Sequence, residues 1–320
     1  MSQGRELDVA AILAGIDDDT PEDHRAGLVA IVGRPNTGKS TLLNRVVGEK
    51  VAIVTRVPGT TRSTVRAVLT EPHRQLVFLD TPGLTKPSTL LAQRLNDRVR
   101  ETWAGVDVVV LVTDVAAGIG PGDAWIAAEL ADLDTPVVAV ANKVDRVQPR
   151  SALLPALTRL SELGAGEVFA DVVPVSAATG ENVDRLVDVV TGHLPRGRRL
   201  VSGEQVSDQT DAQLAAEIVR EKLIRRLDEE VPHSIAVTVD DVVADPDRPD
   251  VLRIEAVIHV ERDSQKGIVI GHRGEVLKAA ATEARHELEA IFTSRVYLAT
   301  HVRVARRWQR DPKQLGRLGY

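Results

Sequence analysis

Eight consecutive residues near the start of the chain have the types and spacing needed to bind a phosphate chain. They are Gly33, Arg34, Pro35, Asn36, Thr37, Gly38, Lys39 and Ser40, and a helical pattern continues from Thr41. The glycines let main-chain N–H groups turn toward phosphates, and the following helix adds the positive end of its dipole. In this pattern Lys39 reaches the β- and γ-phosphates and the Ser40 hydroxyl binds Mg²⁺. The segment predicts a nucleotide site with Mg²⁺; the alternative is a plain glycine turn that opens a helix.

A carboxylate that can complete a magnesium site follows the apolar run over residues 76–79. The residues there are Asp80, Thr81, Pro82 and Gly83. Asp80 would hold Mg²⁺ through water, and the Gly83 amide would respond to the γ-phosphate. Alone, this tetrapeptide is a turn signal. Following a phosphate loop, it predicts the second half of the same site.

Two later segments indicate that the base is guanine. Asn142, Lys143 and Asp145 end the apolar run 137–140, and Ser176, Ala177 and Ala178 follow the last such run. The Asp145 carboxylate can accept hydrogen bonds from N1–H and the 2-amino group of guanine. Adenine offers neither donor, so it would leave the charged group unpaired at a cost of about 1–3 kcal/mol or more. The 176–178 backbone would donate to guanine O6.

These segments need a scaffold of parallel strands. Residues 27–194 alternate short apolar runs with helical stretches, which predicts an α/β domain with a mostly parallel sheet and helices on both faces. Residues 64–69 alternate as an edge strand would. A smaller α+β module follows, in the order helix, strand, strand, helix, strand. We expect an acidic extension over 1–26, a GTP-binding domain over 27–196, a linker over 197–212 and the smaller module over 213–320.

Composition narrows the function further. The chain has 320 residues, 43% hydrophobic and 27% charged, as soluble globular chains do, and no cysteine, which excludes disulfides and thiolate metal sites. Aromatic residues make up 2%, against RNA binding by stacked aromatic platforms. The segment from Arg262 to Arg317 contains twelve Lys or Arg residues and six Asp or Glu residues, although the whole chain has a net charge of −6. A basic end on an acidic protein favours a polyanionic partner, although a solvated basic face is the alternative.

That basic end contains a glycine loop before a helical pattern. Its sequence is Ile268-Val-Ile270-Gly271-His272-Arg273-Gly274, with Lys266 and Lys278 on either side. A tight Gly-x-x-Gly turn lets a nucleic-acid backbone approach closely, and this loop is the signature of KH domains. The strand and helix order resembles the type II KH arrangement. We therefore expect Lys266, Ile270, Gly271, His272, Arg273, Gly274 and Lys278 to bind RNA.

The ordered motifs together resemble those of the Era family of bacterial ribosome-assembly GTPases, over about residues 27–320, including Arg220–Leu223 and Leu318–Tyr320. The resemblance implies that Thr61, in Pro58-Gly-Thr-Thr61-Arg62, closes on Mg²⁺ and the γ-phosphate in the GTP state, with Thr60 as the alternative. It also implies that Asn36 recruits K⁺; otherwise Asn36 is a hydrogen-bonded turn residue. Leu84 stands where signalling GTPases have a water-orienting Gln, so intrinsic hydrolysis should be slow.

The function implied by this resemblance is a GTP-hydrolysing switch with Lys39, Thr61 and Gly83 at its centre. Its partners would be the 3′ end of small-subunit ribosomal RNA and the 30S subunit, with GTP, GDP and Mg²⁺ bound. The alternative is a GTPase whose C-terminal module docks on an anionic membrane or a protein. We expect a cytoplasmic monomer, with peripheral contact at the inner face of the cell membrane under the alternative. Arg62 is expected to face solvent, with a phosphate contact as the alternative. Trp308 is expected to pack on its own domain, with contact to RNA or membrane as the alternative.

Overall fold

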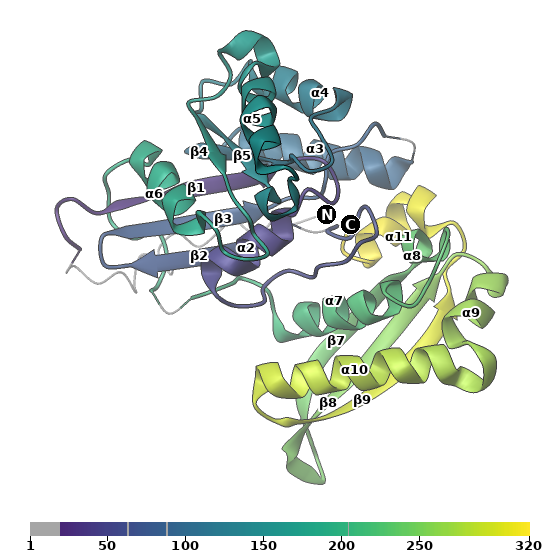
Figure 1. Ribbon diagram of the computed structural model, residues 1–320. Helices are drawn as coiled ribbons and strands as arrows, with labels where there is room; N and C mark the ends of the chain where they lie inside the picture. Colours follow the sequence, from purple (N-terminus) through teal and green to yellow (C-terminus); the bar gives the residue numbers. More distant parts are fainter. Residues whose placement is uncertain (1–19, 63, 88, 204) are drawn as a thin grey trace. The chain divides into compact units, whose positions relative to one another are not determined.

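Two sheets organise the chain, one in each of two units (Figure 1). The computed structural model describes residues 20–62, 64–87, 89–203 and 205–320. Of the described residues, unit 1 contains those in the ranges 20–51, 64–84 and 98–208, and unit 2 contains those in the ranges 52–63, 85–97 and 209–320. The two segments 52–63 and 85–97 therefore group with the C-terminal part of the chain.

Unit 1 contains a six-stranded sheet in the order β2-β3-β1-β4-β5-β6. Its strands are β1 Arg25–Val32, β2 Val65–Glu71, β3 Arg74–Asp80, β4 Val108–Asp114, β5 Val137–Asn142 and β6 Asp171–Pro174. Edge strand β2 runs antiparallel to β3, and the other pairs are parallel. The predicted edge strand and mostly parallel sheet are confirmed. The carboxyl ends of the parallel strands share one edge, which is where open α/β sheets bind ligands.

Helices cover both faces of this sheet, as the sequence predicts. They are α2 Lys39–Val47, α4 Pro121–Leu130, α5 Leu153–Ser161, α6 Val183–His193 and the second part of α3 Leu90–Trp103, whose residues 98–103 belong to unit 1. Neighbouring residues of β1 face opposite ways because side chains alternate along a strand. Ile31 faces Leu42 of α2 and Leu186 of α6. Ala30 and Val32 lie in the core that includes Trp103 at the end of α3 and Ile126 of α4.

Unit 2 contains a three-stranded sheet backed by two long helices. Its elements are α7 Asp211–Ile224, α8 Val231–Ser234, β7 Ala236–Asp245, β8 Arg248–Val260, α9 Asp263–Ile270, α10 Glu275–Phe292, β9 Arg295–Val304 and α11 Pro312–Arg317. β8 pairs antiparallel with β7 and parallel with β9. Ile218 of α7 and Ala284 of α10 share a core with Ile254 and Ile258 of β8. The predicted helix, strand, strand, helix, strand order is confirmed, and α8, α9 and α11 are additional helices.

The units differ from the consecutive domains expected from sequence. Strand β1 begins at Arg25, before the expected boundary at residue 27, and residues 52–63 and 85–97 group with unit 2 rather than unit 1. The boundaries of the acidic extension and the linker stay predictions, and residues 1–19 lie outside the described part of the chain. None of the helices formed by the described residues is long and apolar enough to cross a membrane.

Candidate nucleotide site and glycine-loop groove

The phosphate loop of unit 1 lies between β1 and α2, and two of its glycines are required by geometry. Gly33 has a φ of 146°, and a Cβ there would lie 2.3 Å from the Val112 carbonyl oxygen. Gly38 has a φ of 102°, and its Cβ would meet the Asn142 side-chain nitrogen at 2.3 Å. Thr37, also in the loop, is buried and donates from its hydroxyl to the Arg34 carbonyl at 3.0 Å. Only glycine fits at positions 33 and 38, so the backbone conformation of the loop explains the two glycines of the sequence pattern.

Lys39 points into the loop that it follows. Its Nζ donates to the carbonyls of Gly33 at 3.0 Å and Arg34 at 2.8 Å. Burial lowers the pKa of Lys39 to about 8, and the nearby Asp80 carboxylate opposes that change. The loop therefore holds an ammonium group at the position where the phosphates of a nucleotide would bind.

Ser40 and Asp80 face each other across the start of α2 and the end of β3. The Ser40 hydroxyl donates to Asp80 Oδ2 at 2.8 Å. Asp80 is fully buried, and its Oδ1 has no hydrogen-bond partner among the described residues. Burial raises the pKa of Asp80 to about 6, against the attraction of Lys39 and the Ser40 hydrogen bond.

These two residues fit a magnesium ion. A buried carboxylate oxygen without a partner is costly unless a ligand satisfies it, and oxygen donors suit Mg²⁺. Within the described ranges no cluster of three His, Cys, Asp or Glu residues could hold a metal. The site therefore resembles nucleotide-dependent magnesium sites, in which substrate phosphates and water supply the other ligands.

The segment after Asp80 packs directly against the phosphate loop. The Thr81 hydroxyl donates to the Ile31 carbonyl at 2.7 Å, and Pro82 is buried. A Cβ on Gly83 would lie 2.7 Å from the Pro35 nitrogen. The Leu84 amide donates to the Gly33 carbonyl at 3.1 Å. Gly83 thus lies against the phosphate loop, and its role at the γ-phosphate stays a prediction.

Asn142 connects three loops at the sheet edge. Its Nδ2 donates to the Thr37 carbonyl at 2.8 Å, and its Oδ1 accepts from the amides of Lys143 at 2.8 Å and Ala177 at 3.0 Å. Lys143, with a φ of 68°, donates from Nζ to the Asn36 carbonyl and to Asp114, both at 2.6 Å. The phosphate loop and the two predicted base-binding segments are therefore brought together.

The predicted base-binding residues lie at this edge as well. Asp145 is exposed, and its nearest described charge partner is Arg146 at 3.9 Å. Ser176 and Ala177 are buried, while Ala178 is exposed. Arg45 of α2 donates to the carbonyls of Ala177 at 3.3 Å and Ala178 at 2.6 Å. Sequence reasoning missed Arg45, because no local pattern links α2 to a loop more than 130 residues later.

Arg34 and Asn36 occupy the outer part of the phosphate loop. Arg34 pairs with the buried Asp123 of α4 at 3.2 Å. Asn36 is exposed and has a φ of 64°, which suits an asparagine in a turn. Both readings of Asn36, as a K⁺ ligand and as a turn residue, stay open. Thr41 lies in the first turn of α2, half-buried.

The glycine loop of unit 2 joins α9 to α10. Gly271 has a φ of 75°, and a Cβ there would lie 2.5 Å from a Val276 methyl group. His272 and Arg273 are exposed, and Arg273 also adopts a positive φ of 50°. Lys266 and Lys278 are exposed on the two flanking helices, and Ile270 ends α9 half-buried. The turn is tight and presents basic side chains to solvent, as predicted.

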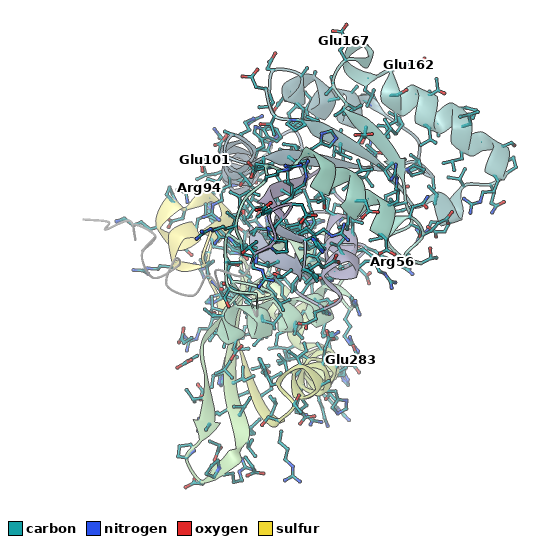
Figure 2. The ribbon with its side chains drawn as sticks, turned by 90° about the vertical axis from the view of Figure 1, so that its left-hand side faces the viewer. Arg56, Arg94, Glu101, Glu162, Glu167 and Glu283 are labelled. Atoms are coloured by element: carbon teal, nitrogen blue, oxygen red, sulfur yellow. The ribbon has the colours of Figure 1, made fainter. Side chains whose placement is uncertain are left out.

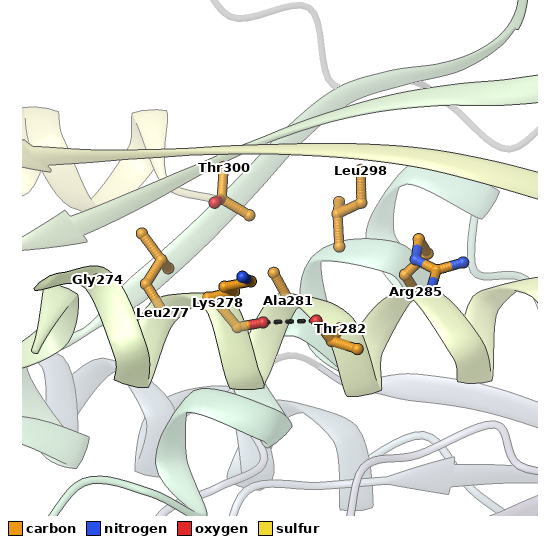
Figure 3. A pocket seen from close by; sticks show the side chains of 8 residues that line it. All are labelled: Gly274, Leu277, Lys278, Ala281, Thr282, Arg285, Leu298 and Thr300. Carbon is orange, nitrogen blue, oxygen red and sulfur yellow. Dashed lines mark hydrogen bonds between the residues drawn. The ribbon is translucent and has the colours of Figure 1, made fainter.

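A groove of about 340 Å³ begins at this loop and continues between α10 and β9 (Figure 3). Lys278, Thr282 and Arg285 supply its polar lining from α10, and the Thr282 hydroxyl donates to the Lys278 carbonyl at 2.8 Å. The remaining lining residues are Gly274, Leu277, Ala281, Leu298 and Thr300. Of the predicted RNA-binding residues, only Gly274 and Lys278 line it. The other lining residues were not predicted; Leu298 and Thr300 come from β9, which lies beside α10 only in the folded chain.

Segment 52–63 belongs to unit 2, and one expectation about it is wrong. Arg62 was expected to face solvent, but it is 4% exposed. The Thr60 hydroxyl donates to the Val57 carbonyl at 2.7 Å, and Thr61 is half-buried. Trp308 is fully buried, as expected, and it packs within unit 2 on Leu91 as well as on Ala236 and Leu315. The assignment of Thr61 to Mg²⁺ and the γ-phosphate stays a prediction.

Models of two protein families match the two parts of the chain. The family described as 50S ribosome-binding GTPase matches residues 28–143, and the KH domain family matches residues 230–309. The first match spans the phosphate loop, Asp80 and Asn142, and the second spans the glycine loop. Fold and site together define a P-loop GTPase that carries a KH domain.

Relatives that match nearly the whole chain identify the family more narrowly. GTPase Era of Mycobacterium sp. strain KMS is 45% identical over 300 residues, covering 93% of this chain and 99% of the relative. GTPase Era of Mycobacterium tuberculosis strain H37Ra is 45% identical over 301 residues, with the same coverage of both chains. The chain belongs to the Era family of GTPases.

Two crystal structures of Era agree with the whole fold. One holds MgGDPNP and nucleotides 1506–1542 of 16S ribosomal RNA, and it is 38% identical with a TM-score of 0.89, covering 93% of this chain and 99% of the other. The second, of an Aquifex aeolicus Era variant bound to GDP and AlF4⁻, is 37% identical with a TM-score of 0.89, covering 92% and 99%.

Proposed function

We propose that this protein is a GTP-hydrolysing switch that binds the 3′ end of small-subunit ribosomal RNA and acts in 30S subunit assembly. The observation that carries the proposal is the tight Gly271–Gly274 turn, with a groove beside it, on a chain that also holds a GTPase site. The Era complex with MgGDPNP and a 16S ribosomal RNA fragment supports the same pairing of ligands. GTP, GDP and Mg²⁺ are the ligands of unit 1.

Each residue of the nucleotide site has a role in this proposal. Lys39 and the amides of residues 33–41 hold the phosphates, while Ser40 and Asp80 hold Mg²⁺, which would neutralise charge between the β- and γ-phosphates. Asp145 accepts from guanine, and the 176–178 backbone donates to O6. Gly83 and Thr61 report the γ-phosphate. Leu84 cannot orient the attacking water, so intrinsic hydrolysis is slow; K⁺ bound at Asn36 would supply additional positive charge.

The glycine loop and groove bind single-stranded RNA. Gly271 allows the RNA backbone to approach the loop, and Lys266, His272, Arg273 and Lys278 face its phosphates. Bases enter the groove, where Thr282, Arg285 and Thr300 can hydrogen-bond to their edges and Leu277 and Leu298 contact their faces. Ile270 anchors the loop to its helix. The protein acts as a cytoplasmic monomer.

RNA binding in two nucleotide states tests this function. The protein is titrated with a 16S ribosomal RNA 3′-end oligonucleotide in the presence of GDP and then of a non-hydrolysable GTP analogue. Tighter binding with the analogue is expected, because GTP must favour the RNA-competent arrangement to act as a switch. Equal affinity in both states would contradict the switch.

Gly271→Asp provides the matching site test. Its side chain cannot fit beside Val276 at this φ, and its charge repels phosphate, so RNA affinity should fall by more than about tenfold. Gly267→Asp is the control, since it places the same charge on α9 where a Cβ meets open space. Equal losses in both variants would contradict the loop assignment. Binding of the wild-type protein to anionic vesicles, with no RNA binding, would favour the membrane alternative.

A further inference from the structure

Two motifs of the Era resemblance that the nucleotide and RNA sites leave unexplained meet in unit 2. They are Arg220–Leu223, on α7, and Leu318–Tyr320, after α11. Segment 52–63, which carries Thr61, is held by residues of both. We define the Arg62 cluster as Arg62, His233, Ile235, Trp308 and Tyr320.

Arg62 is fixed by the main chain and by two aromatic rings. Its Nη1 donates to the Ile235 carbonyl at 2.6 Å and its Nη2 to the His233 carbonyl at 2.9 Å. The guanidinium carbon lies 5.6 Å from the Trp308 ring centre and 5.8 Å from that of Tyr320. These rings stack on each other with centroids 5.5 Å apart. Planar stacking with two hydrogen bonds is a geometry that lysine cannot reproduce.

The Trp308 ring is itself anchored to the same turn. It is fully buried, and its indole N–H donates to the Ser234 carbonyl at 2.9 Å. The carbonyls of three successive residues, His233 to Ile235, thus accept from Arg62 and Trp308. This turn leads directly into β7, the first strand of the KH sheet.

Two arginines, Arg220 of α7 and Arg225 directly after it, also donate hydrogen bonds to segment 52–63. Arg220, fully buried, donates to the Thr60 carbonyl and to Glu217, and Arg225 donates to the Val54 carbonyl at 3.0 Å. Val57 packs against the core of the KH module. Arg220 Nη1 is buried and finds no hydrogen-bond partner among the described residues. In this conformation of segment 52–63, one N–H donor of Arg220 is therefore without an acceptor in the described part of the chain. A second conformation of the segment could supply that acceptor.

Segment 85–97 reaches the same aromatic pair. Leu91 is buried in a core with Ala236, Trp308 and Leu315. Arg94, labelled in Figure 2, donates to the Tyr320 carbonyl at 3.5 Å. Segment 52–63 follows Ser40 in the sequence and segment 85–97 follows Asp80. Each of the two segments therefore contacts both Trp308 and Tyr320.

We propose that Arg62 is a positioning residue that transmits the nucleotide state to the KH module through Trp308 and Tyr320; this inference rests on the proposed switch function. Thr61 and Arg62 are adjacent, with Cα atoms about 3.8 Å apart, so a shift of Thr61 displaces Arg62 or breaks its hydrogen bonds. A buried guanidinium without hydrogen-bond acceptors is costly, so positions of Arg62 between two hydrogen-bonded arrangements are unfavourable. The change at Arg62 is therefore two-state.

The test measures coupling rather than affinity alone. RNA affinity of the full chain is determined with GDP and with a non-hydrolysable GTP analogue for the wild type, Arg62→Lys and Tyr320→Ala. Arg56→Ala is the matched control, an exposed arginine of the same segment. The ratio of the two affinities should fall from the several-fold or greater value typical of coupled sites to about one in both test variants and stay unchanged in the control. GDP affinity should stay within about threefold, because neither residue belongs to the nucleotide site.

A second readout keeps this inference separate from the proposed function. Amide hydrogen exchange of residues 52–62 should become faster in Tyr320→Ala and stay unchanged in Arg56→Ala, whatever the RNA affinities. An unchanged affinity ratio in Arg62→Lys and Tyr320→Ala, with a wild type that does switch, overturns the inference. Unchanged exchange in Tyr320→Ala overturns it too. A wild type with equal RNA affinity in both nucleotide states overturns the proposed function instead.

Discussion

At the scale of single residues, the chemistry of the nucleotide site is set by burial. Lys39 and Asp80 are both buried, and burial disfavours the charged form of each side chain. It lowers the pKa of Lys39 to about 8 and raises the pKa of Asp80 to about 6. Their mutual attraction offsets part of this effect. For Asp80, whose pKa is raised, the contribution to folding stability is complete below its ordinary value of 3.8 and is lost as the pH rises through about 6.

This shift predicts a pH-dependent response to magnesium. Mg²⁺ needs the ionised Asp80 carboxylate, so the tightening of GDP binding by Mg²⁺ should be present at pH 7.5 and decline as the pH falls through about 6 or somewhat below, since the cation favours ionisation. Fluorescent-GDP titrations with and without Mg²⁺ between about pH 5 and 8 measure it. Asp80→Asn should bind GDP with little Mg²⁺ effect at any pH. The same Mg²⁺ effect in this variant as in the wild type would contradict the assignment.

Single residues also show what sequence could and could not predict. Lys39, Ser40, Asp80 and Asp145 follow apolar runs at fixed spacing, and the motifs encode local backbone geometry that a short stretch of chain determines alone. Arg62 was misjudged because its burial depends on Trp308, which lies far along the chain. A polar residue in a polar segment carries no local sign of such a partner.

At the scale of elements, loops after three strands act as one site because Asn142 joins them. The parallel order of β1, β5 and β6 could be predicted, since alternating strand and helix patterns favour it. The hydrogen bonds from Asn142 to Thr37 and Ala177 could not, because they depend on the register of neighbouring strands. The helix α9 was missed for a related reason: it is short, contains Gly267, and shows no clear apolar stripe.

Asn142→Ala should weaken both the fold and nucleotide binding. Loss of three hydrogen bonds should lower the free energy of unfolding by about 2–4 kcal/mol and weaken GDP binding, since the phosphate loop and the 176–178 loop lose their common partner. Denaturant unfolding and GDP titration measure the two effects. Thr113→Val is the control, because it removes one buried hydrogen bond, to the Val140 carbonyl, away from these loops. GDP affinity as high as that of the control would contradict the bridging role.

At the scale of the whole molecule, charge separates the acidic chain from its basic end. The net charge of −6 conceals the excess of Lys and Arg between residues 262 and 317. In the structure these residues include Lys266, Arg273 and Lys278, on or beside the glycine loop. An RNA should therefore be attracted to this part of the surface, with an affinity that depends on salt.

Salt titrations of RNA binding test that view. The slope of log affinity against log salt concentration should become shallower by about 0.7 in Lys278→Ala, the value for one phosphate contact on a single strand. Lys313→Ala, an exposed lysine of α11 outside the groove, should leave the slope unchanged. Equal slopes for all three proteins would mean that Lys278 contacts no phosphate.

The division of the chain into units has a consequence for how such proteins can be recombined. The polypeptide passes between the units after residues 51, 63, 84, 97 and 208, so no single peptide bond separates a GTPase part from a KH part. A chimera that exchanges only residues 209–320 for those of a distant relative would keep Arg62 and Leu91 but replace Trp308 and the core residues that contact them in this chain. A functional chimera should therefore require that segments 52–63 and 85–97 are exchanged together with the KH module. In natural homologues, substitutions in these three stretches should be correlated.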